Sequence, residues 1–219
     1  MATIFIKVLK EQLSGSIASN QQIRSAAINS AIDIVNPRID DLISEVQDDP
    51  ISQEIAGGPS ADNISGIVSA SDANLFTYIG FDQEETPIDN LIKFLKDNTK
   101  IDKRFARFNN QTFKFEVPVQ IPTVAEIDDE PSLQYPDNWN PGSWVNGITR
   151  GISGLSYYLR TRTKSGALKY NVAGSRSGSA FQVKRQIRAS NNTVKANGYV
   201  GKYLSEFRRK FRDALGRFT

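Results

Sequence analysis

The charged residues of this chain are segregated along its length, and this constrains its fold more than any other sequence feature. Residues 1–149 carry 11 Lys and Arg against 22 Asp and Glu, whereas residues 150–219 carry 16 Lys and Arg against only Glu206 and Asp213. The two parts have net charges of −11 and +14 within an overall charge of +3. Cations cannot be buried without partners. The basic third must therefore face solvent, nucleic acid phosphate, or an acidic surface of the same chain or of a neighbouring copy.

Composition narrows the function of the 219-residue chain. It contains no Cys and no His, which excludes disulfides, thiolate zinc sites, cysteine nucleophiles, histidine metal ligands and Ser-His-Asp triads. No stretch approaches the roughly 18 consecutive apolar residues of a membrane helix, and the apolar run at the amino terminus ends at Lys7, too early for a signal peptide. We therefore expect a structural or binding protein in a cytosol-like compartment, not an enzyme and without membrane association.

Apolar residues recur every three or four positions in several segments, which predicts helices. Residues 3–47 are predicted to be helical, with Pro37 breaking or kinking the second helix. Asp49-Pro50 predicts the start of a short helix that ends at the glycines 57 and 58. Further helices are predicted from Thr86-Pro87 onward and over about 199–212, and a helical or mixed segment is predicted from Ser143 past Leu159.

Alternating apolar residues over 111–121 predict the most secure strand, and Pro118 places it at an edge or end of its sheet. Shorter strands are predicted at 63–69, 75–81 and 180–189, with a loop at 164–179. The fold class is therefore α+β, with a helical N-terminal part, a small antiparallel sheet and a basic C-terminal helix. We expect one domain over 1–219, helical over 1–60, mixed over 61–190, and ending in the basic helix and tail over 191–219.

The segment from Pro122 to Pro141 is acidic and rich in proline. Glu126, Asp128, Asp129 and Glu130 are carboxylates that suit Mg²⁺ or Ca²⁺, but they lack the spacing of an EF-hand. A solvated loop is the favoured interpretation, and we expect no bound metal, nucleotide or organic cofactor. Glu126, Asp128 and Asp129 are the candidates for a carboxylate-dependent hydrolase, which no second motif supports.

The last predicted helix has an apolar stripe and a cationic side. Burial of the stripe would leave the cations in need of acidic partners from the front two-thirds of the chain, from another subunit or from DNA, unless they face solvent. The candidate contact residues of this segment are Phe207, Arg208, Arg209, Lys210, Phe211, Arg212 and Phe218.

Several stretches resemble the neck or tail-completion proteins that form the head–tail connector of tailed bacteriophages. The matched pieces lie within residues 49–185; they are Asp49–Pro59, Asn63–Gly66, Asn74–Phe81, Gly142–Val145, Gly151–Leu155 and Ser175–Val183. The resemblance implies a virion protein forming a homo-oligomeric ring, a hexamer or dodecamer, as tail terminator, stopper or adaptor. It also implies contacts with portal or tail proteins, a lumen that passes DNA without specific binding, and no active site.

Ring subunits meet through two different surfaces of the same chain. The charge split predicts that acidic residues of 1–149 contact basic residues of 150–219 in the neighbouring copy. The alternative is a nucleic-acid-binding protein that uses the basic third, with Tyr170, Phe181, Tyr199 and Tyr203 as stacking groups.

Overall fold

A computed structural model of the chain describes residues 2–9, 20–68, 74–105, 107–109, 114–136, 142–151, 157–161, 180–184 and 197–216. The fold is α+β, as the sequence predicted. The sequence indicated one domain, whereas the chain forms two compact units. Unit 1 comprises Met1–Glu45, Lys93–Thr123 and Lys202–Thr219, and unit 2 comprises Val46–Ile92 and Val124–Gly201.

The sheet of unit 1 is organised around β4 (Lys114–Ile121), which confirms the predicted strand. Along one side β4 pairs antiparallel with β1 (Ala2–Leu9), in a register that runs from Ala2 opposite Ile121 to Leu9 opposite Lys114. Along its other side it pairs with β2 (Lys100–Ile101) and β3 (Arg107–Asn109). The predicted edge position of this strand is wrong, because β4 has neighbours on both sides.

Pro118 is tolerated in this central strand because the strand opposite it is interrupted. Its carbonyl accepts a hydrogen bond from Asp102 N at 2.9 Å, just after β2. The N–H and C=O of one residue in a strand point to the same side. The missing N–H of Pro118 would therefore face the gap between β2 and β3, which the short 3₁₀ helix η3 (Lys103–Phe105) fills. Proline costs no ladder bond there.

The predicted helix at 3–13 is wrong, since residues 2–9 form β1. Apolar residues of this segment recur every three or four positions, but Ile4, Ile6 and Val8 also follow one another at every second position. β-branched residues favour a pleated strand, and pairing with β4 over eight positions selects that alternative. Residues 10–13 lie outside the described part of the chain.

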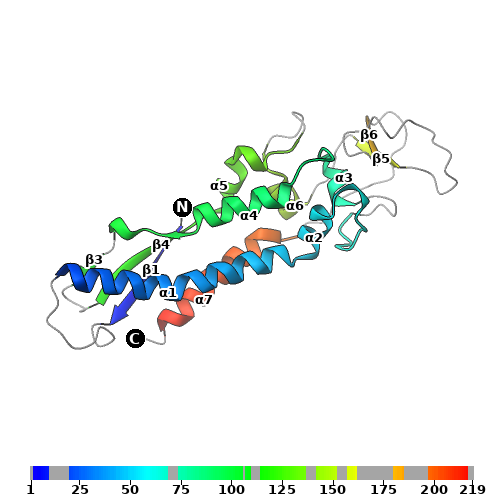
Figure 1. Ribbon diagram of the computed structural model, residues 1–219. Coiled ribbons are helices and arrows are strands. Elements are labelled where there is room, and N and C mark those ends of the chain that lie inside the picture. Colours follow the sequence, from blue (N-terminus) through cyan, green and yellow to red (C-terminus); the bar gives the residue numbers. More distant parts are fainter. Residues whose placement is uncertain are drawn as a thin grey trace. The chain divides into compact units, whose positions relative to one another are not determined.

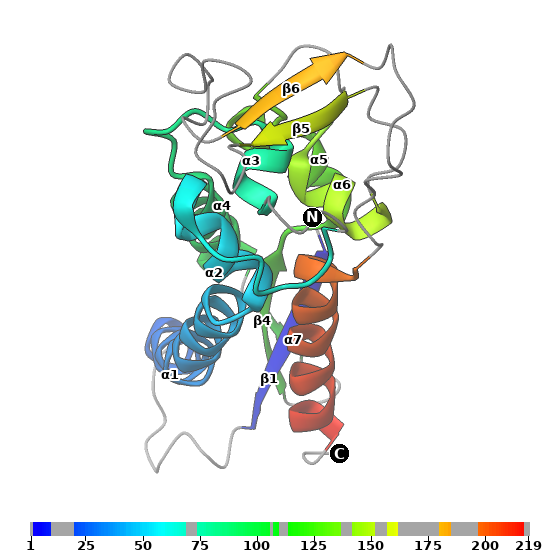
Figure 2. The same ribbon diagram turned by 90° about the vertical axis from the view of Figure 1, so that its right-hand side faces the viewer.

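Two long helices belong largely to unit 1, α1 (Asn20–Gln47) and α7 (Tyr199–Gly216). They run in opposite directions in Figure 1, and contacts from Arg38 and Glu45 on α1 to Lys210 on α7 join them. In Figure 2, which views α1 nearly end-on, the β1–β4 pair is drawn between them. The helix predicted at 199–212 is confirmed. Pro37 does not break α1; it lies on the exposed side, where water can bond the carbonyl that its missing N–H leaves free.

The core of unit 1 collects apolar residues from both long helices, from the end of α4 and from β4. These residues are Ala27, Ala31, Val35, Leu42, Leu95, Val117, Val119, Ile121, Leu204, Phe207 and Phe211, all buried.

Unit 2 is built from short elements. They are α2 (Pro50–Ala56), η2 (Gly58–Ser60), α3 (Leu75–Ile79), α5 (Val124–Asp129), η4 (Pro131–Leu133), α6 (Trp144–Arg150), β5 (Tyr157–Thr161) and β6 (Ala180–Lys184). β5 and β6 pair with each other, antiparallel. The helix α4 (Pro87–Asn98) starts in unit 2 and ends in unit 1. The predicted starts of α2, α4 and α6 are confirmed, as is the first half of the strand at 180–189.

Three other expectations for unit 2 are corrected. The segment that begins at Ser143 does not continue past Leu159 as one element, because α6 ends at Arg150 and Leu159 belongs to β5. The acidic segment is not simply a loop, since it contains α5 and η4. Residues 63–67 form no strand. The predicted loop at 164–179 lies outside the described residues.

The segment predicted as a strand at 75–81 is instead α3, and its end signals explain why. Asn74 caps the first turn, with its side-chain oxygen accepting from Thr77 N at 2.9 Å. Gly80 ends the helix in the left-handed region, at φ 91°. Asn as N-cap and Gly just past the last residue are helix signals. They outweigh the strand preference of the aromatic residues between them.

An aromatic cluster forms the centre of unit 2. Trp144 is fully buried; its ring stands edge-on to Phe81 at 5.7 Å and lies 6.3 Å from Tyr199. Phe76 extends the cluster, 5.3 Å from Phe81. Within the described residues, no helix is both long and apolar enough to span a bilayer.

Candidate functional site

The aromatic candidates of α7 belong to the interior of unit 1. Phe207 and Phe211 are 3% and 1% exposed, and their rings meet edge-on at 4.8 Å. The guanidinium of Arg38 on α1 lies 5.1 Å from the centre of the Phe211 ring. These rings therefore stabilise the helix pair and are not presented for contact with another protein. Phe218 and the side chain of Arg212 lie outside the described part.

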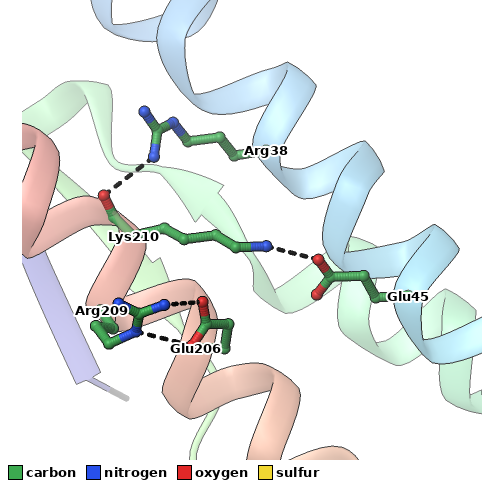
Figure 3. Close-up of polar contacts among 5 residues, drawn as sticks. All are labelled: Arg38, Glu45, Glu206, Arg209 and Lys210. Carbon is green, nitrogen blue, oxygen red and sulfur yellow. Dashed lines mark hydrogen bonds and ion pairs between the residues drawn. The ribbon is translucent and has the colours of Figure 1, made fainter.

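The cationic candidates of α7 bond within the chain (Figure 3). Lys210 Nζ lies 2.6 Å from Glu45 Oε1 on α1, and Arg38 Nη1 donates to the Lys210 carbonyl at 3.1 Å. Arg209 Nε donates to Glu206 Oε2 at 2.8 Å, and a second contact joins Arg209 Nη2 to Glu206 Oε1. The front two-thirds of the same chain thus supply the partner of Lys210.

Arg208 is held differently, by a carbonyl. Its Nη2 donates to the carbonyl oxygen of Pro122, just after β4, at 2.9 Å. Its Nε is buried and has no hydrogen-bond partner among the described atoms. The contact ties α7 to the end of the central strand.

These ion pairs are exposed enough to be weak. The side chains of Lys210 and Glu45 are 37% and 36% exposed, and exposed pairs contribute about 0–1 kcal/mol. The hydrogen bond from Arg209 is the main cause that lowers the pKa of Glu206 below its ordinary value. The polar contacts of α7 therefore orient the helix more than they stabilise it.

The acidic segment uses its carboxylates for local hydrogen bonds. Asp128 Oδ1 accepts from Ser143 N at 2.9 Å, at the start of α6. Glu130 Oε1 accepts from Ser132 Oγ at 2.8 Å and from Ser132 N at 3.3 Å. In the part of the chain that the structure describes, no three acidic residues are grouped as metal ligands would be. The observed bonds of Asp128 and Glu130 join α5, η4 and α6.

Glu54 is a buried acidic residue of unit 2 that the sequence did not single out. Its side chain is 0% exposed, and both of its oxygens accept backbone hydrogen bonds. Leu75 N donates to Oε1 at 2.7 Å, and Ser65 N donates to Oε2 at 2.9 Å. A carboxylate is buried only where such bonds replace its hydration. Its position between Ser52 and Ile55, on the buried side of α2, is the sequence signal that could have identified it.

Asn74 completes this bridge. Its amide nitrogen donates to the carbonyls of Gly58 at 3.0 Å and Ala61 at 2.8 Å, while its oxygen caps α3 at Thr77. The first three stretches that carry the phage resemblance, Asp49–Pro59, Asn63–Gly66 and Asn74–Phe81, are thus joined into one hydrogen-bonded body. We call this body the Glu54 bridge.

The turn at Asn63 is shaped by its own side chain. Asn63 Oδ1 accepts from Gly66 N at 3.1 Å, and Asn63 Nδ2 donates to the Val68 carbonyl at 2.9 Å. Gly66 has φ 64°, in the left-handed region that favours glycine. The Asn-Ile-Ser-Gly sequence is therefore explained by backbone geometry.

The proposed base-stacking residues are only partly described, and one of them is unsuitable. Tyr199 is 0% exposed, and its hydroxyl shares a 2.6 Å hydrogen bond with Ser52 Oγ. Tyr203 lies under Lys202, whose Nζ is 4.7 Å from the centre of the ring. Tyr170 and the side chain of Phe181 lie outside the described residues.

Comparison of the chain with protein-family models, with curated proteins and with solved structures gives no match. The function is therefore argued from the residues of this chain.

Proposed function

We propose that the chain is a structural subunit of a homo-oligomeric ring in the head–tail connector of a tailed bacteriophage, at the neck or the upper end of the tail. The observation that carries the proposal is the Glu54 bridge. It joins the segments on which the resemblance rests, and it does so through buried bonds from Glu54 to Ser65 and Leu75.

The bridge gives those segments a structural reason to occur together. A buried carboxylate requires donors at fixed positions, and here the turn before Val68 and the first residue of α3 provide them. Such a set of residues is a signature of a folded body and not of a reaction. A ring is assembled from many copies in one geometry, and rigid building blocks lower the entropic cost of that association.

The test is the assembly state of the full-length chain. Native mass spectrometry and negative-stain electron microscopy are expected to show closed rings of six or twelve copies with a central channel. Exclusively monomeric or two-fold symmetric dimeric protein, across concentrations from micromolar to hundreds of micromolar, contradicts the proposal.

A nucleic-acid-binding role is supported by the absence of Asp and Glu from residues 151–205 of the sequence. The burial of Tyr199 counts against it, because a buried ring cannot stack on a base. A gel-shift titration at two salt concentrations separates the two functions. Tight, steeply salt-dependent binding of DNA by the monomer would favour this alternative over the ring.

A further inference from the structure

The outer side of α1 in unit 1 is acidic and carries an exposed aliphatic side chain. Asp33, Asp40 and Asp41 are exposed, and Ile34 is 41% exposed. Seven residues make about two helical turns, so Asp33 aligns with Asp40 and Ile34 with Asp41. We call these four residues the acidic face.

Both cations of α1 bond backbone carbonyls of other elements, although Arg38 lies three residues before Asp41, on the same side of the helix. Arg24 Nη2 donates to the carbonyls of Lys103 at 3.0 Å and Arg104 at 3.3 Å, and Arg38 bonds the Lys210 carbonyl. Among the residues that the structure describes, none forms an ion pair with Asp33, Asp40 or Asp41. The three aspartates are thus free of ion pairs in the part of the chain that the structure describes.

Unit 1 also carries a second charged surface, which is basic. Lys93, Lys96, Lys100 and Lys103 are all exposed, and they follow the end of α4, β2 and η3. Within the described ranges no carboxylate pairs with any of these four lysines. Asp97 lies among them, which leaves a net charge of +3. We call these four residues the lysine ridge.

Asp33 and Asp40 lie on the side of α1 opposite Arg24. Arg24 fastens η3, which contains Lys103, to α1 through two carbonyls. Arg24 precedes Asp33 by nine residues, which is about two and a half helical turns. The side of α1 that meets η3 is therefore opposite Asp33 and Asp40, while Ile34 and Asp41 lie about a quarter turn from it. Two complementary surfaces that point in different directions are what head-to-tail association requires.

We propose that the acidic face of one copy docks on the lysine ridge of the next copy, with Ile34 as the apolar contact beside the charges. The occupant is a second copy because the same unit carries both complementary charges, three aspartates against a net +3. This inference rests on the proposed ring, for which it names the interface.

The described α7 cations are less suited to this contact than the lysine ridge. Arg208, Arg209 and Lys210 already bond Pro122, Glu206 and Glu45 within their own chain. Using them between subunits would first break those bonds. Charge segregation along the sequence assigned the basic side of the interface to residues 150–219. The proposal assigns it to the lysine ridge instead.

Charge reversal with rescue by mixing tests the interface. One full-length variant carries Asp33→Lys, Asp40→Lys and Asp41→Lys, and the other carries Lys93→Glu, Lys96→Glu, Lys100→Glu and Lys103→Glu. Each variant alone then presents two surfaces of like charge and is expected to associate at least about tenfold more weakly than wild type in sedimentation velocity. An equimolar mixture is expected to regain association, because every contact again joins opposite charges.

A matched control reverses exposed acids outside both surfaces, with Asp62→Lys, Glu84→Lys and Asp129→Lys. The control is expected to associate as wild type does, and association of wild type is expected to weaken with salt. The proposal is overturned if the control loses association as much as the acidic-face variant, if mixing gives no recovery, or if wild type does not self-associate.

The two proposals fail separately. Salt-sensitive self-association that is lost and rescued as described, but that yields filaments without closed rings, supports the interface and contradicts the connector function. Closed rings that persist in both charge-reversed variants support the ring and contradict this interface. Circular dichroism of each variant verifies that lost association is not lost folding.

Discussion

The two units hold their helices by different means. In unit 2, side chains that are almost fully buried bond backbone groups directly, as Glu54 and Asn74 do. In unit 1, half-exposed charges such as Lys210 and Glu45 join α7 to α1. The two buried side-chain atoms that lack a hydrogen-bond partner among the described residues, Thr99 Oγ1 and Arg208 Nε, both belong to unit 1. We therefore expect salt to change the stability of unit 2 little, and substitution of its buried polar side chains to change it much. In unit 1 we expect salt to weaken the ion pairs, and substitution of the paired residues to cost little.

The largest effect is expected at the Glu54 bridge. Glu54→Ala leaves the buried N–H groups of Ser65 and Leu75 without acceptors, and it should lower the free energy of unfolding by about 3 kcal/mol. Urea unfolding measures the loss, and amide hydrogen exchange at the two residues locates it. Exposed Glu84→Ala is the control. A loss below about 1 kcal/mol would show that the bridge is not the main support of unit 2.

Asn74→Ala should have the second largest effect. The substitution removes the cap of α3 and the two bonds to Gly58 and Ala61, for an expected loss of about 2 kcal/mol. Asn74→Asp keeps the cap but not the donors, so it should recover only part of the loss. If Asn74→Asp recovers the whole loss of unfolding free energy, the effect of Asn74→Ala comes from the cap alone.

Thr99 offers the opposite change in unit 1. Its hydroxyl is buried without a partner in the described residues, so Thr99→Val should raise the free energy of unfolding by about 1 kcal/mol. Thr99→Ser retains the hydroxyl and should give no gain. If Thr99→Val instead lowers the free energy of unfolding, the Thr99 hydroxyl has a hydrogen-bond partner in solution.

The pair between α1 and α7 should contribute little. A double-mutant cycle with Lys210→Met and Glu45→Gln is expected to give a coupling free energy of about 0.5 kcal/mol at low salt. The coupling should decrease in 1 M NaCl because exposed charges are screened. A coupling that salt leaves unchanged would contradict the contrast drawn between the units.

The smallest effect is expected at Glu206. Because Arg209 lowers its pKa in the folded chain, the pair stabilises above the ordinary pKa of glutamate, and this contribution disappears as the pH falls through the lowered value. Arg209→Met should return the pKa of Glu206 toward 4.5 in an NMR titration. An unchanged pKa would contradict the contact.

Local signals determined several elements. The Asp49-Pro50 start of α2 and the Thr86-Pro87 start of α4 follow from capping chemistry, which acts over a few residues. The alternation of apolar and polar residues over 111–121 identified β4, because this pattern is also set by neighbouring residues. The signals for α3 were also local, at Asn74 and Gly80, but the aromatic residues between them indicated a strand.

Other features could not follow from the local sequence, because they depend on residues far apart in the chain. β1 is a strand because β4 pairs with it, and Pro118 fits a central strand because η3 lies opposite. Glu54 has no motif of its own; its donors come from residues 65 and 75.

The sequence by itself determined the α+β class, the starts of three helices, and the surplus of acid in 1–149 and of base in 150–219. Only the tertiary structure decided which of those charges are already used. It pairs Lys210 with Glu45 and leaves Asp33, Asp40 and Asp41 exposed on the outer side of α1. The physical reason is that an ion pair forms only within a few ångströms, whereas a count of charges along the chain carries no information about distance.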